Sequence, residues 1–63
     1  MKLKKGEKYW YVNSYIGLTE FDWRNDRMEH KLRRVGNLFL TEPKAQSALK
    51  KIKKVLREAR KNG

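Results

Sequence analysis

The chain has 63 residues, enough for one small domain with one small hydrophobic core. It contains no cysteine, which excludes disulfides and thiolate metal sites. Seventeen lysine and arginine residues against seven acidic ones give a formal net charge of +10 at pH 7. We find no apolar run long enough for a signal peptide or a membrane span, so we expect a cytoplasmic protein without a membrane partner.

The positive charge is concentrated in the second half of the chain. Residues 1–30 carry six basic and five acidic groups, whereas residues 31–63 carry eleven basic and only two acidic groups. Such a field attracts polyanions and predicts DNA or RNA as a partner, with no preference between them. The alternative interpretation is that the lysines and arginines only keep a small domain soluble.

Two strands are predicted in the first half of the chain. Residues 8–13 are rich in the aromatic and β-branched side chains that fit a pleated sheet, and residues 18–24 alternate apolar and polar side chains. The intervening Ser14–Gly17 segment has the composition of a turn, so we expect an antiparallel hairpin. Alternation along the first strand separates Trp10 from Tyr9, and we expect Trp10 on the core face.

Residues 27–36 fit two periodicities. As a helix, the segment begins with a capping box of Asp26 and Glu29, and Met28, Leu32 and Val35 form an apolar stripe. As a strand, the segment begins near Lys31, breaks at Gly36, continues into residues 38–40 and pairs with the second strand. The pattern does not decide between the two, and we give a slight preference to the strand.

The last element is predicted as a long helix. Thr41 suits the N-cap, Pro43 suits the first turn, and the apolar residues that follow keep a helical spacing to about Lys61. Its length, roughly 30 Å at 1.5 Å per residue, exceeds what a short sheet covers, so the last turns project or pair with a second copy. The fold class is therefore α+β, with a two- or three-stranded antiparallel sheet packed against one long C-terminal helix. We treat residues 1–63 as one domain, with a basic N-terminal arm (1–7), a sheet region (8–40) and the helix (41–61).

The sequence does not favour catalysis. His30 is the only histidine, and neither Ser14, in a turn, nor Ser47, on the helix, has a base beside it. Glu20 and Asp22 share a strand face but lack a pocket that would separate their pKa values. We therefore expect no catalytic residues, no metal site and no cofactor.

The candidate binding residues lie on two surfaces. If Trp10, Val12, Phe21 and Trp23 pack under the helix, the opposite sheet face presents aromatic and cationic side chains that suit base stacking and phosphate binding. Cross-strand tyrosine pairing is the equally supported alternative. Cations of the long helix provide further phosphate contacts. The predicted nucleic-acid-binding residues are Tyr9, Tyr11, Arg24, Arg33, Arg34, Lys50, Lys54 and Arg57.

The segment Gly36-Asn37-Leu38-Phe39-Leu40-Thr41 and Ala45 resembles a motif of small domains from bacteriophages and mobile elements of Gram-positive bacteria. A looser similarity extends to integrase arm-binding and AP2 domains, in which a Gly-x-Phe-x-Thr stretch also leads into a helix. That similarity implies a three-stranded sheet whose face away from the helix enters the DNA major groove. This chain differs by one extra residue between Gly36 and Phe39 and by Pro43-Lys44 in place of acidic residues, so no base-contacting residue is transferred.

Together these features predict a small basic nucleic-acid-binding accessory protein of phage or mobile-element type. The alternative is a protein-interaction module, such as a phage inhibitor that docks on an acidic surface of a host protein, because electrostatic steering serves both functions. A monomer and a homodimer are compatible with either function.

Overall fold

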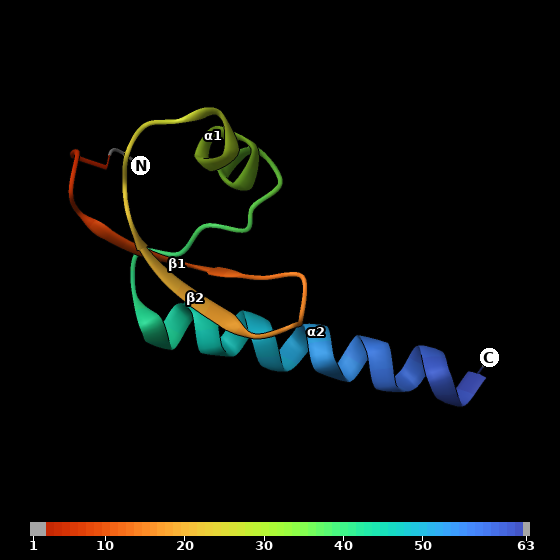
Figure 1. The fold of residues 1–63 in the computed structure, drawn as a ribbon. Helices are drawn as coiled ribbons and strands as arrows, with labels where there is room; N and C mark the ends of the chain where they lie inside the picture. Colours follow the sequence, from red (N-terminus) through yellow and green to blue (C-terminus); the bar gives the residue numbers. More distant parts are fainter. Residues whose placement is uncertain (1–2, 63) are drawn as a thin grey trace.

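The structure of the protein is a computed structural model that describes residues 3–62. Its elements are β1 (Lys8–Val12), β2 (Leu18–Asp22), α1 (Arg27–Arg34) and α2 (Glu42–Asn62). The sheet lies between α1 and α2, and the far end of α2 projects from the rest of the molecule (Figure 1). The predicted α+β class, with an antiparallel sheet and one long C-terminal helix, is confirmed, and α1 is an additional short helix.

β1 and β2 form a two-stranded antiparallel hairpin. Tyr9 lies opposite Phe21, and Trp10 lies opposite Glu20. Both strands begin at the predicted residues and end one or two residues earlier, at Val12 and at Asp22. Because directly opposite residues share a face, this register places Phe21 on the face of Tyr9 and not, as predicted, with Trp10.

The ambiguous segment is a helix, and the preference for a strand beginning near Lys31 was wrong. The capping box is present: Asp26 Oδ1 accepts from the Glu29 N–H at 2.9 Å, and Glu29 Oε1 accepts from the Asp26 N–H at 3.1 Å. These two bonds satisfy donors that a helix start otherwise leaves unpaired. Of the predicted apolar stripe only Leu32 packs against the core, while Met28 and Val35 are exposed. Capping therefore determines this helix more than its apolar face does.

The connection from α1 to α2 is built from the Gly-Asn-x-Phe motif. Gly36 has φ +79 and ends α1 in a Schellman arrangement, in which the Asn37 N–H donates to the Leu32 carbonyl at 2.8 Å. The Asn37 side-chain amide pairs with both backbone groups of Val12 at 2.8 Å. Phe39 then pairs with Trp10 in an isolated antiparallel bridge. The predicted third strand is thus reduced to one bridge, which joins β1 and not β2.

The N-terminal segment, predicted as a basic arm, is joined to residue 23 by backbone hydrogen bonds. The Gly6 N–H donates to the Trp23 carbonyl at 2.9 Å, and the Trp23 N–H donates to the Glu7 carbonyl at 2.8 Å. Leu3 packs against the core. Residues 1 and 2 of the predicted arm lie outside the described residues.

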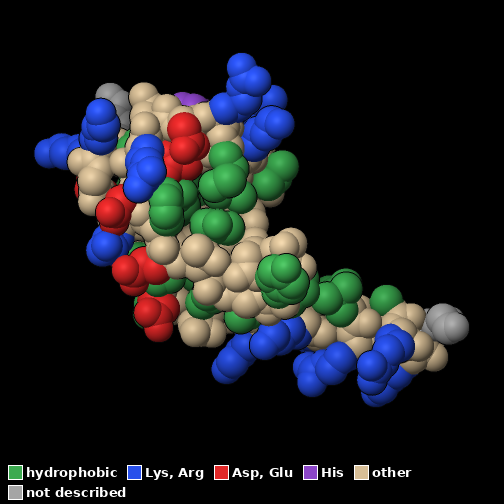
Figure 2. Space-filling view, in the orientation of Figure 1, with side chains coloured by type: hydrophobic (Ala, Val, Ile, Leu, Met, Phe, Trp, Pro, Cys, Tyr) green, Lys and Arg blue, Asp and Glu red, His purple; other side chains and the backbone are tan. Residues whose placement is uncertain are grey.

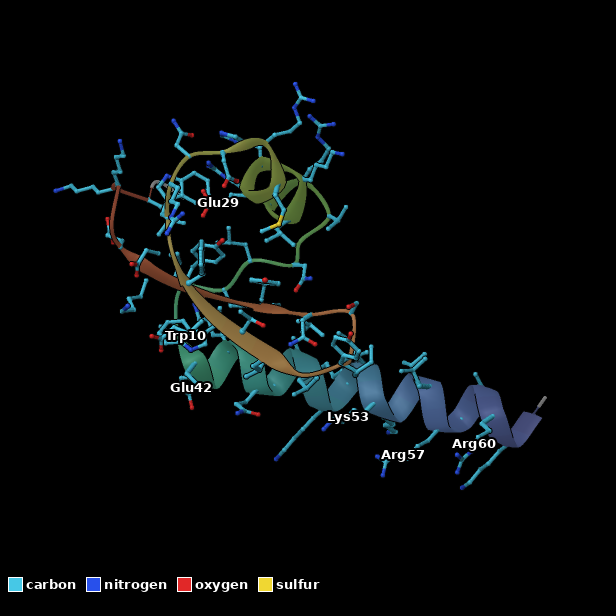
Figure 3. All side chains as sticks on the ribbon, in the orientation of Figure 1. Trp10, Glu29, Glu42, Lys53, Arg57 and Arg60 are labelled. Atoms are coloured by element: carbon cyan, nitrogen blue, oxygen red, sulfur yellow. The ribbon has the colours of Figure 1, made fainter. Side chains whose placement is uncertain are left out.

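The core between the sheet and α1 differs from the predicted one, because Tyr9 takes the place expected for Trp10, whereas Trp23 is buried as predicted. Tyr9, Trp23 and Leu38 are buried together, with Tyr11 and Leu32 packed against them. The rings of Tyr9 and Trp23 meet edge to face at a centroid distance of 6.1 Å. Trp10 is half-buried and points toward the first turns of α2 (Figure 3). The prediction failed because it assumed one covered face, whereas a sheet with helices on both sides needs apolar side chains on both.

The first half of α2 packs on the hairpin, and its second half does not. Ala45 and Leu49 are buried, whereas Val55 is 63% exposed and Leu56 is 51% exposed. Every described side chain after Ile52 is exposed. The last turns of α2 project from this single copy, and their pairing with a second copy stays a prediction. We call residues 50–61 the arm.

Candidate nucleic-acid interface

The structure removes Tyr9 from the predicted surface. Its side chain is fully buried, and its hydroxyl donates to Glu29 Oε2 at 2.8 Å. Burial, reinforced by this bond to a carboxylate, raises the pKa of the Tyr9 phenol well above its ordinary value. A neutral ring enclosed in the core does not stack on bases, so its assignment to an exposed binding face is corrected.

Glu29 is the polar centre of this core. It is fully buried, and its carboxylate accepts from the Tyr9 hydroxyl, from the Arg24 N–H at 2.8 Å and from the Asp26 N–H at 3.1 Å. Three donors offset the desolvation of the carboxylate. This arrangement is structural, because every partner belongs to the protein and no side is open to a ligand.

The other sheet-side candidates are dispersed. Tyr11 is half-buried with its ring 6.1 Å from that of Tyr9. The Arg24 guanidinium is exposed and lies 4.8 Å from the centroid of the Phe21 ring, a cation–π contact within the hairpin. Because α1 and the core cover this side of the sheet, the open face implied by the AP2-type similarity does not exist in this chain.

Arg33 and Arg34 lie in the last turn of α1, not on a strand. Both side chains are exposed, and basic groups there complement the carbonyl end of the helix. Arg33 also interacts within the protein. With Arg27 and Lys31 they are the four cations of α1, which we call the α1 patch, and Figure 1 shows α1 on the other side of the sheet from α2.

Three of the predicted residues, Lys50, Lys54 and Arg57, come together on the arm. At about 100° per residue they lie within a band of roughly 120° around the helix, together with three other cations. We call this band the arm stripe, and it comprises Lys50, Lys53, Lys54, Arg57, Arg60 and Lys61. Figure 3 shows Lys53, Arg57 and Arg60 projecting from the same side of α2, and Figure 2 shows positive charge along that side with hydrophobic side chains on the other.

The hairpin tip faces the arm and adds an aromatic ring that the prediction missed. Tyr15 is 92% exposed, and with Ile16 it lines one side of an open groove of about 800 Å³. The arm provides the rest of the lining, namely Lys50, Lys53, Lys54, Leu56 and Arg57. The groove thus combines four cations and one exposed aromatic ring, and no acidic residue lines it.

The tip is held by a network centred on Asn13. Its Oδ1 accepts from the Tyr15 N–H at 2.9 Å and from the Gly17 N–H at 3.1 Å, and its Nδ2 donates to Thr19 Oγ1 at 2.9 Å. Ile16 has φ +59, a left-handed conformation that is rare for a β-branched residue. The ring of Tyr15 is therefore presented by a fixed turn.

Glu20 and Asp22, the two carboxylates on one face of β2, both lie near Lys8. The Lys8 ammonium lies 2.8 Å from Asp22 Oδ1 and 3.6 Å from Glu20 Oε1 at the exposed sheet edge. The hydrogen bond from Lys8 holds the pKa of Asp22 below its ordinary value. Within residues 3–62, no three histidine or acidic residues are grouped so that they can hold a metal ion. The helices of that same range are too short or too polar to cross a membrane.

Only part of the groove could be predicted from the sequence. Lys53, Arg60 and the other helix cations follow from helical spacing, but their contact with the hairpin tip depends on where α2 crosses the sheet. Tyr15 lies in the predicted turn, where a large aromatic side chain is exposed unless another element covers it.

No protein-family model matches the chain, and neither a curated protein nor a solved structure matches it.

Proposed function

We propose that this protein is a small cytoplasmic nucleic-acid-binding accessory protein of phage or mobile-element type, and that the arm is its principal contact with phosphates. The observation that carries the proposal is the arm stripe. It places six cations along one side of a projecting helix, and every described side chain beyond Ile52 is exposed. Phosphate binding needs positive charge density more than a specific geometry, and this surface supplies it.

The distribution of the remaining charge supports the same surface. The arm carries seven basic residues and a single acidic one, Glu58. Within the described residues no carboxylate pairs with Lys53, Arg57 or Arg60. Acidic side chains instead gather at the far end of the molecule from the arm (Figure 2). A polyanion approaching this field is oriented toward the arm before contact.

The test compares two variants of equal charge. Replacing Lys53, Arg57 and Arg60 by Gln removes half of the arm stripe, and we expect the affinity for a fluorescent oligonucleotide at about 0.15 M salt to fall by at least tenfold. Fluorescence anisotropy measures this affinity. All three side chains are exposed, so the fold should persist, which circular dichroism verifies.

The matched control replaces Lys4, Lys5 and Arg27, which lie away from the arm, by Gln. We expect this variant, with the same net charge, to lose less than threefold in affinity, because its charges act only at a distance. Equal losses in both variants would show that binding follows net charge alone and would overturn the assignment to the arm. A third variant, Arg33→Gln with Arg34→Gln, measures whether the α1 patch contributes.

The apolar side of the arm favours a second candidate, the protein-interaction module. Ile52 is half-buried, and Val55 and Leu56 are exposed, so α2 presents an uncovered amphipathic surface. This function predicts a saturable one-to-one complex with an acidic host protein and little salt-dependent affinity for nucleic acid. The anisotropy experiment separates the two functions, because only nucleic-acid binding predicts a strong signal with the oligonucleotide alone.

A further inference from the structure

The groove between the hairpin tip and the arm has a composition that a general phosphate surface does not require. A cationic helix binds duplex and single-stranded polyanions alike, since both present phosphates. This groove adds Tyr15, whose ring is 92% exposed, at the end of a hairpin. An exposed ring beside cations is the combination that binds single strands, in which bases are free to stack while cations hold the backbone.

We infer that this groove binds single-stranded nucleic acid, with one unpaired base stacked on Tyr15 and the neighbouring phosphates held by Lys50, Lys53, Lys54 and Arg57. The inference rests on the proposed function and extends it by naming the form of nucleic acid. Bases inside a duplex are stacked on one another and do not offer a face to a side chain.

The backbone of the turn that carries Tyr15 is fixed by hydrogen bonds. Asn13 accepts from the N–H groups on both sides of Ile16, namely those of Tyr15 and Gly17, and the backbone N–H of Ile16 donates to the Asn13 carbonyl at 3.0 Å. Because this backbone is already ordered, only the side chain of Tyr15 loses freedom when a base stacks on it, which favours affinity.

The size and charge of the groove fit this occupant. Its volume of about 800 Å³ falls within the range of roughly 300–1,000 Å³ that is usual for small-molecule sites, so it accommodates a nucleotide with its flanking phosphates. Four cations and no carboxylate line it, which matches a backbone with one negative charge per nucleotide. Leu56 adds an apolar surface beside the ring.

The test uses Tyr15→Ala and the conservative Tyr15→Phe in the full chain. The probes are an oligo(dT) strand, an RNA strand of the same length, a duplex and heparin, which carries charge but no base. We expect Tyr15→Ala to lower the affinity for oligo(dT) or RNA about tenfold, while duplex and heparin affinities change less than twofold. Tyr15→Phe retains the ring face and should bind single strands as the wild type does.

The outcomes separate this inference from the proposed function. If the wild type binds none of the probes in a salt-dependent manner, the proposed function fails and the inference fails with it. If the arm variant loses affinity but Tyr15→Ala binds single strands like the wild type, the proposed function stands and the stacking site is wrong. Equal losses for all four probes would assign Tyr15 a structural role.

Discussion

At the scale of single residues, the buried pair of Tyr9 and Glu29 organises the core between the sheet and α1. The sequence indicates Glu29 as the partner of Asp26 in a capping box, and that role is confirmed. It does not indicate that the same carboxylate also accepts from the Tyr9 hydroxyl, 20 residues earlier in the chain. A polar contact between distant residues produces no periodic pattern in the sequence. Alternation of side chains alone therefore predicted Trp10 in the core and Tyr9 on the surface.

The raised pKa of Tyr9 predicts a loss of stability at alkaline pH. The folded protein holds the phenol neutral, whereas the unfolded chain releases its proton at about pH 10. The contribution of Tyr9 is therefore fully present below that pH and is lost as the pH rises toward the higher folded pKa. Urea unfolding followed by tryptophan fluorescence, from about pH 9 to about pH 11, measures this loss.

Tyr9→Phe supplies the comparison for this measurement. It leaves one oxygen of Glu29 buried without its donor, and we expect it to lower the free energy of unfolding by about 1–3 kcal/mol near neutral pH. The variant should also lose stability less steeply above about pH 10, because the buried phenol is gone. Parallel pH profiles for the two proteins would contradict a raised pKa at Tyr9, since the lysines titrate in both.

At the scale of elements, the features that depend on neighbouring residues were predicted well, and those that depend on contacts between distant segments were not. The start of α2 after Thr41 and its extent to Asn62, one residue past the predicted Lys61, follow from local signals, and both strands begin where alternation predicts. The segment after Gly36 was predicted less well. Its residues look like a strand, but the Asn37 side chain takes the place of backbone pairing with Val12, and only Phe39 continues the sheet. The pairing of the Asn37 side chain with the Val12 backbone is a contact between distant residues. The local sequence pattern does not distinguish this arrangement from a true strand.

The division of α2 into a packed half and an arm predicts two rates of amide hydrogen exchange. Residues 45–52 are covered in part by the hairpin, whereas every described side chain beyond Ile52 is exposed, and isolated helical segments of that length are marginal in water. We expect the amides of residues 54–61 to exchange at least tenfold faster than those of residues 45–52 in an NMR experiment on the free protein. A saturating oligo(dT) strand should slow exchange in the arm selectively.

Uniform protection along α2 in the free protein would contradict this division. It would mean that another surface covers the arm, and the candidate is a second copy of the chain. Sedimentation at micromolar concentration, run on the same sample, distinguishes a dimer from a stable isolated helix.

At the scale of the whole molecule, the buried core and the exposed cations of α2 lie toward opposite ends of the chain's long axis. The principal extents are 43 × 22 × 19 Å, so the molecule is elongated, and Figure 1 shows that the projecting α2 accounts for its long axis. One end contains the covered sheet and the buried Glu29, and the other presents the arm stripe and the tip of the hairpin. The excess of charge in residues 31–63 was evident from the sequence. The division of this charge between α1 and the arm was not evident from the sequence, because the division depends on residues 27–34 forming a helix.

This charge distribution predicts how steeply binding depends on salt. For single strands the slope of log affinity against log salt is about −0.7 per phosphate neutralised, so full engagement of the six cations of the arm stripe gives a slope of about −4. Replacing Lys53, Arg57 and Arg60 by Gln leaves three cations and should reduce the slope to about −2. Tyr15→Ala should lower the affinity and leave the slope near −4, because stacking releases no counterions. Anisotropy titrations of the three proteins with oligo(dT) across a salt series measure all three slopes. A slope that stays near −4 in the arm variant would mean that other cations bind the phosphates, whereas a slope that falls with Tyr15→Ala would mean that the ring positions the strand on the arm stripe.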